Sequence, residues 1–331
     1  MPTVKNYLSL IKFSHTIFAM PFALIGFFLG LFSGVALEGE VTYGTGQWNL
    51  NKTIGKFGGE DSLSSGWNEW MPVIIKFLLV IGCMVFARSA AMAFNRYLDR
   101  QFDARNPRTA IREIPAGILK ANSVLIFTIV NCLLFITCTF FINRLCFYLS
   151  PVALLVVLGY SYTKRFTPLC HLVLGIGLSL APIGAYLAVV GQFSVLPVLF
   201  SLAVIFWVSG FDIIYALQDE EFDRTQKLYS IPSWLGKAKA LRVSEILHVI
   251  SAAFVITAGI YGQLGWLYWG GVVVFAGMLI YQHSLVKPGD LRRVNIAFMT
   301  ANGVASVVFA VFVIADMFVR AHNELPHYVI K

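Results

Sequence analysis

The sequence predicts an all-α integral membrane protein, a bundle of about nine transmembrane helices with a cytoplasmic N-terminus. Of its 331 residues, 58% are hydrophobic and only 13% are charged, whereas soluble domains have about 45 to 50% apolar and about 25% charged residues. The apolar residues also fall into long runs, and a helix that crosses a bilayer needs roughly 20 of them. We therefore expect one membrane domain over residues 1–331.

Nine apolar runs of this kind follow one another along the chain. They cover residues 14–36, 71–94, 121–142, 145–160, 168–190, 194–217, 241–263, 266–285 and 296–319. Residues 37–70, rich in Gly, Ser and Asn, are expected to form a loop insertion on the outer side. The five cysteines lie in or beside the apolar runs without a CxxC pair, so neither a disulfide framework nor a zinc site is indicated.

The distribution of Lys and Arg predicts the orientation. With nine spans, 19 of the 25 Lys and Arg residues fall on the side of the N-terminus. Positive residues collect on the cytoplasmic side of membrane proteins, so the N-terminus is expected inside and the C-terminus outside, in the plasma (inner) membrane. The net charge of +8 is then mainly an orientation signal, and nucleic-acid binding is not indicated.

The first unusual segment is NRYLDRQFD, at the inner end of the second run. Asn95, Asp99 and Asp103 are spaced by four residues, which places them on one face of a helix. Arg88 extends this stripe into the membrane. A solvated helix with Asp–Arg pairs would also produce this pattern, and the segment alone does not decide between the two.

A second such segment, DIIYALQDEEFD (residues 212–223), ends another run on the same membrane side. Asp212, Tyr215, Asp219 and Asp223 share one helical face, and Asp212 lies at the end of the apolar run, where a charged residue is costly and usually functional. Two opposed carboxylate clusters suit a Mg²⁺ ion that holds a diphosphate, because this ion takes most of its ligands from phosphate and water.

The inner loops provide cations for the phosphates. Arg108 and Arg112 lie in NPRTAIREIPAG (residues 106–117), and Lys164 and Arg165 lie in YSYTKRFTP (residues 160–168). Arginine binds phosphate in a bidentate manner and lysine acts as a point charge. For Lys164 and Arg165, ordinary positive-inside charge explains the sequence equally well.

These segments resemble the motifs of a known family. NRYLDRQFD resembles the NxxxDxxxD motif of the UbiA superfamily of intramembrane aromatic prenyltransferases, and DIIYALQDEEFD resembles its second Asp motif. RTAIREIPAG is similar to the family's RTxxRPxPxG loop, with Glu113 in place of a proline, and YSYTKRFT is similar to its Tyr and Lys/Arg loop. The resemblance spans most of the chain and favours the 4-hydroxybenzoate polyprenyltransferase-like branch.

The resemblance implies Mg²⁺-dependent transfer of a polyprenyl group from polyprenyl diphosphate to an aromatic acid, in ubiquinone or menaquinone biosynthesis. The acceptor would be 4-hydroxybenzoate or a dihydroxynaphthoate, and the active site would face the cytoplasm. The metal would be held by Asp99, Asp103, Asp219 and Asp223. The diphosphate would be bound by Asn95, Arg108, Arg112, Lys164 and Arg165.

Three further residues receive expected roles on the acceptor side. Tyr215 would shield the allylic cation, Asp212 would bind or deprotonate the phenol, and Arg88 would bind the acceptor carboxylate. Alternatively, Asp212 and Arg88 simply pair inside the bundle. A secondary transporter is the alternative from another class, because intramembrane Asp and Arg also mark ion and substrate paths. The position of most Asp residues at inner helix ends, without an inverted repeat beyond the two motifs, favours the enzyme.

Overall fold

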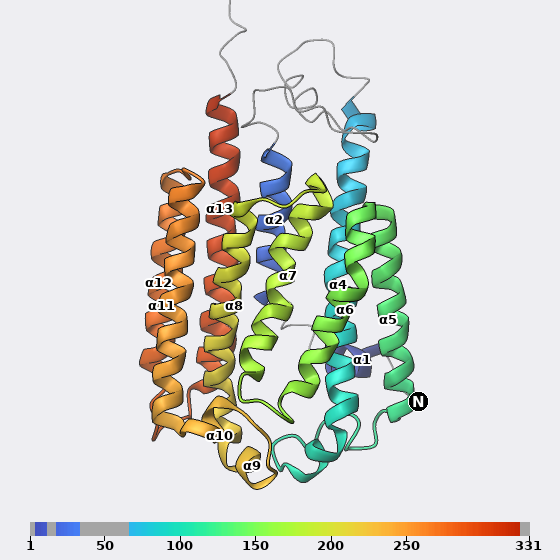
Figure 1. Cartoon of the computed structure of the whole chain (residues 1–331), viewed down its shortest axis with the longest axis vertical. Coiled ribbons are helices and arrows are strands. Elements are labelled where there is room, and N and C mark those ends of the chain that lie inside the picture. The colour runs from blue at the N-terminus through green and yellow to red at the C-terminus, as the bar shows by residue number, and fades with distance from the viewer. Residues whose placement is uncertain (1–3, 12–17, 34–65, 325–331) are drawn as a thin grey trace, which may run out of the picture.

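The structure is a computed structural model that describes residues 4–11, 18–33 and 66–324, with only the backbone given at 66–69 and 323–324. Its long helices run side by side and form one bundle (Figure 1). In chain order the elements are α1 (Val4–Leu10), α2 (Met20–Phe32), α4 (Gly66–Arg105), α5 (Ala121–Ile142), α6 (Arg144–Thr163), α7 (Cys170–Val190), α8 (Val195–Ala216), the 3₁₀ turn η3 (Leu217–Asp219), α9 (Glu220–Thr225), α10 (Ile231–Leu235), α11 (Lys237–Tyr261), α12 (Trp266–Leu285), the π-helical turn η4 (Ile296–Ala301) and α13 (Asn302–Glu324).

The predicted helical membrane class is confirmed. Seven helices in the described part of the chain are long and apolar enough to cross a membrane. The shorter α2 and the 20-residue α12 lie in the same bundle (Figure 1). That these two also cross the membrane, and that the N-terminus is cytoplasmic, stay predictions. The expected loop at 37–70 falls largely outside the described residues, but its predicted end is wrong because α4 already begins at Gly66.

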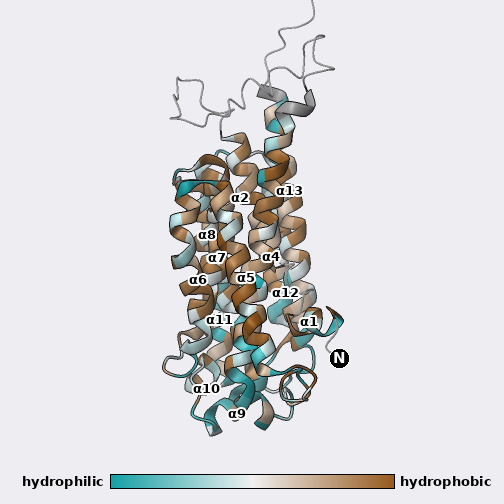
Figure 2. Cartoon of the chain, turned by 90° about the vertical axis from the view of Figure 1, so that its right-hand side faces the viewer, coloured by the Kyte–Doolittle hydropathy of each residue, from teal (hydrophilic) through white to brown (hydrophobic). Residues whose placement is uncertain are grey.

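The surface of the bundle is apolar, as contact with lipid requires. Hydrophobic residues cover the long helices, whereas hydrophilic residues gather at the end that carries α9 and α10 (Figure 2). Large exposed apolar side chains are found on α5, α6, α11 and α12, for example Ile126, Leu155, Val249, Val273 and Ile280. A protein in water rarely exposes so much apolar surface. These positions indicate the face that meets the acyl chains.

Helix α8 lies inside the bundle, in contact with α7 and α11. Its residues Phe200, Trp207 and Ile213 have no exposed surface. Helices α2 and α7 approach each other closely, because a Cβ atom at Gly26 would lie 1.9 Å from the carbonyl oxygen of Pro182. Small residues permit this close approach of helices, which in a membrane replaces the hydrophobic driving force available in water.

Helix ends follow from local sequence. Asn143 separates α5 from α6, and its Oδ1 caps α6 by accepting a hydrogen bond from the Cys146 N–H at 2.8 Å. This confirms the predicted division of the apolar residues between 121 and 160. Ser230 begins α10 with a capping box that includes Ser233. Gly191 ends α7 in the left-handed conformation, with φ of 74°.

The π-helical turn η4 precedes α13 and leaves backbone carbonyls without their usual helical partners. The Asn302 side chain covers two of them, donating from Nδ2 to the carbonyls of Ala297 and Phe298 at 3.0 Å each. Its Oδ1 accepts a hydrogen bond from Trp207 Nε1 at 3.0 Å. The turn is therefore fastened to the middle of α8, and Phe298 packs on Tyr215 with ring centroids 4.3 Å apart.

Helix α1 was not predicted as a separate element. Its Leu10 is buried with Leu119 and Val124, so α1 packs where the chain enters α5. Ser9 Oγ donates a hydrogen bond to Glu113 Oε1 at 2.5 Å. Glu113, which stands where the resembling loop pattern has a proline, thus connects the loop of residues 106–117 to α1.

Candidate active site

Both Asp segments lie at the same end of the bundle, here called the carboxylate end. Asp99 and Asp103 occupy the last turns of α4, as predicted. The second segment is less regular than a single helical face, because α8 ends at Ala216 and the chain passes through the 3₁₀ turn η3 into α9. Asp219 therefore belongs to η3 and Asp223 to α9, and both carboxylates meet cations of the neighbouring loops.

Each of the four motif carboxylates is paired with a different cation from a neighbouring loop. The pairs are Asp99 with Arg165 at 3.3 Å, Asp103 with Arg112 at 2.6 Å, Asp223 with Lys164 at 2.7 Å, and Asp219 with Arg108. The structure thus brings together all eight charged residues that were expected to hold the metal and the diphosphate. Lys164 and Arg165 pair directly with the motif carboxylates, so positive-inside charge alone does not account for them.

Arg108 connects the loop after α4 to the second Asp motif. Its Nε donates to Asp219 Oδ1 at 3.0 Å, its Nη2 donates to Asp219 Oδ2, and its Nη1 donates to the Tyr215 hydroxyl at 3.0 Å. Asn106 supports this arrangement, because its Nδ2 donates to Asp219 Oδ1 at 3.2 Å and its Oδ1 accepts from the Arg108 backbone N–H at 3.0 Å. One loop after α4 is thereby fixed to the end of α8.

These contacts shift the pKa values of two loop cations, Lys164 and Arg108. Burial disfavours charge on Lys164, but the ion pair and hydrogen bond with Asp223 outweigh it and raise the lysine pKa. Burial likewise opposes charge on Arg108, and its hydrogen bonds and attraction to Asp219 raise its pKa on balance. Both cations stay charged at physiological pH, as the binding of an anion such as diphosphate requires.

The donor set fits a Mg²⁺ ion that reaches the protein together with phosphate. Among the described residues, no three His, Cys, Asp or Glu side chains form a ready-made metal site, and Mg²⁺ commonly uses only one or two carboxylates plus substrate phosphates. Asp103 Oδ2 is buried and accepts no hydrogen bond from the described residues. Asp99 Oδ2 accepts one from Asn95 Nδ2 at 3.2 Å. Hard carboxylate oxygens with spare acceptor capacity therefore lie at this end.

The acceptor-side residues lie deeper in the bundle. Asp212 Oδ2 is 2.7 Å from His171 Nδ1, so the alternative in which Asp212 pairs with Arg88 is wrong. Arg88 Nε is buried with no hydrogen-bond partner in the described part of the chain. Tyr160, on α6, interacts electrostatically with Arg88, Asp99 and Asp212, so these groups lie in the same region of the bundle. An intramembrane arginine with an unsatisfied nitrogen is suited to an anionic ligand.

Sequence reasoning missed four residues of this region: Asn106, Tyr160, His171 and Ser230. Asn106 precedes Pro107 in a loop that was singled out for its arginines, and an Asn–Pro pair is itself a turn signal. His171 carried a second signal, because it is a polar residue near the start of an apolar run. Nothing in the sequence marked Ser230, whose Oγ donates to Asp223 Oδ2 at 3.0 Å.

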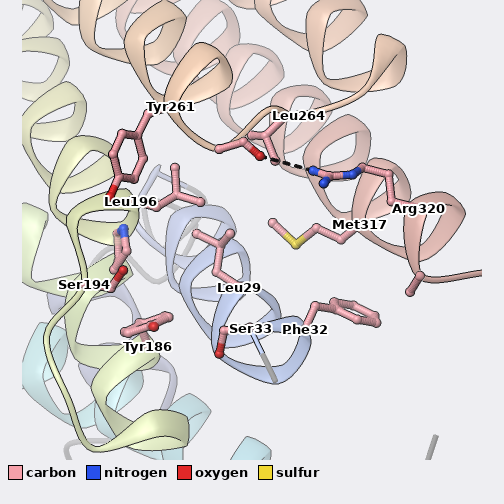
Figure 3. Close-up of a pocket in the computed structure, with 13 residues that line it drawn as sticks. Leu29, Phe32, Ser33, Tyr186, Ser194, Leu196, Tyr261, Leu264, Met317 and Arg320 are labelled. Carbon is pink, nitrogen blue, oxygen red and sulfur yellow. Dashed lines mark hydrogen bonds between the residues drawn. The ribbon is translucent and has the colours of Figure 1, made fainter. Parts of the chain in front are cut away.

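A pocket of about 410 Å³ lies at the opposite end of the bundle. It is lined by the first residues of α8, including Leu196, and by the last residues of α2, α7, α11 and α13 (Figure 3). Arg320 closes one side and donates to the Gly262 carbonyl at 3.3 Å. Because α8 carries its Asp motif at its other end, this pocket is separate from the carboxylate end.

The sequence of the chain is similar to those of known proteins. Residues 63–304 match the model of the UbiA prenyltransferase family. A 4-hydroxybenzoate octaprenyltransferase of Tolumonas auensis is 33% identical over 239 residues, covering 72% of this chain and 83% of the relative. The enzyme of the same name from Aliivibrio salmonicida is 32% identical over 252 residues, covering 74% and 85%.

Solved structures share the fold. The apo structure of a UbiA homolog from Aeropyrum pernix K1 superposes with a TM-score of 0.69 at 26% identity, covering 92% of this chain and 98% of that one. A UbiA homolog from Archaeoglobus fulgidus, bound to DMAPP and Mg²⁺, superposes with a TM-score of 0.62 at 17% identity, covering 95% and 99%.

Proposed function

The chain belongs to the UbiA prenyltransferase family, and we propose that it transfers a polyprenyl group from a polyprenyl diphosphate to an aromatic acid, with Mg²⁺ as the cofactor. Family membership makes it an aromatic prenyltransferase of the membrane and removes the transporter alternative. One observation carries the finer proposal: four carboxylates from two distant segments meet four cations from the loops between them at one end of the bundle.

The carboxylate end would bind the diphosphate of the donor. Asp99, Asp103, Asp219 and Asp223 would hold Mg²⁺, which when bound neutralises the charge of the leaving diphosphate. The cations paired with these carboxylates would share that charge, and Asn95 would add an oxygen ligand or a phosphate contact. Arg108 is especially suited, because its guanidinium already presents three donors to this end.

The reaction breaks the allylic C–O bond, and the electron pair leaves with the diphosphate. The resulting allylic cation must be kept from water. Tyr215 lies at the border between the charged end and the apolar core. Its ring centroid is 5.3 Å from Cζ of the Arg108 guanidinium and 4.3 Å from the ring centroid of Phe298. We assign to it the shielding of the cation.

The acceptor would lie between Tyr215 and the deeper polar residues. A ring carbon next to its hydroxyl attacks the cation, a C–C bond forms, and one proton is released. Asp212 would accept the hydrogen bond of the phenol and take its proton as the ring attacks. The C–H proton of the attacked carbon is then lost and the oxygen is protonated again, so that the aromatic phenol is restored and one proton is released in total. Arg88 would bind the carboxylate of the acceptor, since its Nε has no partner among the described residues.

The names of the relatives bear on the identity of the acceptor. Several relatives at 28 to 33% identity are named 4-hydroxybenzoate octaprenyltransferase. We propose 4-hydroxybenzoate or a dihydroxynaphthoate as the acceptor, in ubiquinone or menaquinone biosynthesis. The relatives are bacterial, and the excess of Lys and Arg at the carboxylate end supports the proposal that this end faces the cytoplasm at the inner membrane.

The test is an assay of the purified protein in detergent. Polyprenyl diphosphate, Mg²⁺ and either 4-hydroxybenzoate or 1,4-dihydroxy-6-naphthoate are incubated with and without EDTA, and products are detected by mass spectrometry. We expect one acceptor to be prenylated and EDTA to abolish the product. Prenylation that persists in EDTA would contradict the metal assignment, and the absence of product with both acceptors would contradict the proposed substrates.

A further inference from the structure

We infer that His171 is a positioning residue, which holds Asp212 as an oriented carboxylate toward the aromatic acceptor by donating a hydrogen bond from Nδ1. The inference rests on the proposed function, because Asp212 receives its acceptor role there. His171 lies in the first turn of α7 and Asp212 in the last turns of α8. His171 Nδ1 and Asp212 Oδ2 are 2.7 Å apart.

The protonation of His171 follows from its other nitrogen. The backbone N–H of Ile231 points at His171 Nε2, with the nitrogens 3.3 Å apart. A backbone N–H can only donate, so Nε2 must be the acceptor of the ring. The single hydrogen of the neutral imidazole is then on Nδ1, from where it is donated to Asp212. The ring is 3% exposed, so water does not compete for either nitrogen.

The two helices that carry this pair are packed closely. A Cβ atom at Gly175 would lie 2.4 Å from the carbonyl oxygen of Ile205, so only glycine allows α7 to approach α8 at this distance. Ser209 Oγ also donates to the His171 carbonyl at 3.1 Å. The distance between His171 and Asp212 is therefore set by the backbones, which is the support that a functional side chain needs.

One oxygen of the Asp212 carboxylate accepts a hydrogen bond from His171, and no described residue donates to the other. Oδ2 is engaged by His171, whereas the side chain as a whole is 24% exposed. Asp212 lies one helical turn before Tyr215 on α8, so it borders the region proposed for the aromatic acceptor. A hydrogen bond from His171 stabilises the ionised carboxylate and fixes its rotamer, leaving Oδ1 to accept the phenol hydroxyl and its proton.

Residues 229–231, at the start of α10, contact both the metal side and the acceptor side of the proposed site. Ile231 orients His171, and the preceding Ser230 donates to Asp223 Oδ2 at 3.0 Å. Tyr229 donates from its backbone N–H to the Lys164 carbonyl at 2.7 Å. The start of α10 thereby links the carboxylate proposed for the metal to the carboxylate proposed for the acceptor.

Two substitutions separate positioning from mere packing. The side-chain nitrogen of His171→Asn lies near the position of Nδ1 and keeps the donor for Asp212, but loses the acceptor for Ile231. The terminal oxygen of His171→Gln lies near the position of Nε2 and keeps the acceptor for Ile231, but loses the donor for Asp212. Both variants are assayed in detergent with donor and acceptor varied separately, and their unfolding temperatures are measured.

We expect His171→Gln to lower kcat/KM for the acceptor by roughly tenfold or more, the size expected for a lost hydrogen bond to a charged group, with the KM for the donor within about twofold. His171→Asn should retain most of the activity even if it unfolds at a lower temperature. Equal losses in both variants, or losses that follow the unfolding temperatures, would overturn the inference. A wild type without product would instead overturn the proposed function, and the inference with it.

A measurement on the wild type covers the case in which neither variant folds. Nitrogen-15 NMR of protein labelled at histidine should show, at neutral pH, a neutral ring with its hydrogen on Nδ1. Because this is the less common tautomer of free histidine, its presence supports the assignment and its absence overturns it.

Discussion

Replacing Arg108 by lysine keeps the positive charge but removes the planar fork that joins the loop after α4 to the second Asp motif. The arginine makes three hydrogen bonds, two to Asp219 and one to Tyr215. An ammonium group behaves as a point charge and would retain one of them. The variant therefore loses two hydrogen bonds without changing the net charge of the site.

The size of the expected loss in activity depends on how deeply the Arg108 and Asp219 side chains are buried. Hydrogen bonds to charged groups contribute about 1.5 to 3 kcal/mol when buried, but the side chains of Arg108 and Asp219 are 32% and 13% exposed. Solvent screening lowers the value, so we use about 1 kcal/mol for each lost bond. Two bonds give about 2 kcal/mol, which corresponds to a roughly 30-fold loss in kcat/KM for the prenyl diphosphate.

The structure offers a matched control. Arg292 also forks onto an aspartate, with Nε and Nη2 at 2.9 and 2.7 Å from the Asp290 oxygens, but it is 87% exposed and its partner is two residues away. Arg292→Lys should change kcat/KM by less than about twofold. The assay is initial rate against donor concentration at saturating acceptor. If Arg108→Lys also stays within twofold of the wild type, or if both variants lose activity equally, the reasoning is refuted.

Three further predictions concern the charged residues. Asp99→Asn and Asp219→Asn should abolish turnover yet elute as folded protein in detergent, and full activity in either would remove that residue from the metal site. Arg88→Ala should raise the KM for the acceptor at least roughly tenfold with little change for the donor, whereas equal effects on both substrates would exclude it from the acceptor site. The ion pair with Asp223 raises the pKa of Lys164, so its stabilisation is complete below about pH 10.4 and declines only above the raised value. The difference in unfolding temperature between wild type and Lys164→Met should therefore be constant from pH 7 to 9, and a difference that shrinks in this range would disprove the pair.

The sequence was most informative where one kind of residue recurred at a regular spacing. Apolar runs of sufficient length predicted α5, α6 and α12 almost to their ends, because a single physical requirement, the thickness of the bilayer, sets them. The spacing of Asp99 and Asp103 likewise predicted a shared helical face. Such patterns are local, and local patterns can be read directly.

The hydrogen-bond and ion-pair partners of the Asp residues could not be predicted from the spacing of residues in the sequence. Asp212 lies seven residues from Asp219 in the chain, yet its partner His171 is 41 residues away on another helix. Which cation meets which carboxylate depends on how loops fold back over the bundle, and the interruption of α8 at η3 rotates the second motif in a way that four-residue spacing does not reveal. The partner of Asp212 therefore came only from the structure.

The π-helical turn before α13 makes the length of the chain critical at one place. Each residue of an α-helix turns the side chains by about 100°, so α13 keeps its orientation only if η4 retains its number of residues. Phe309 and Val313 are buried in the core through this orientation. Deleting one residue between 296 and 301 would move both side chains from buried positions on α13 to the partly buried positions of Val308 and Phe312. Insertions and deletions should therefore be excluded from this turn in functional variants, because here the count of residues, and not only their identity, encodes the site.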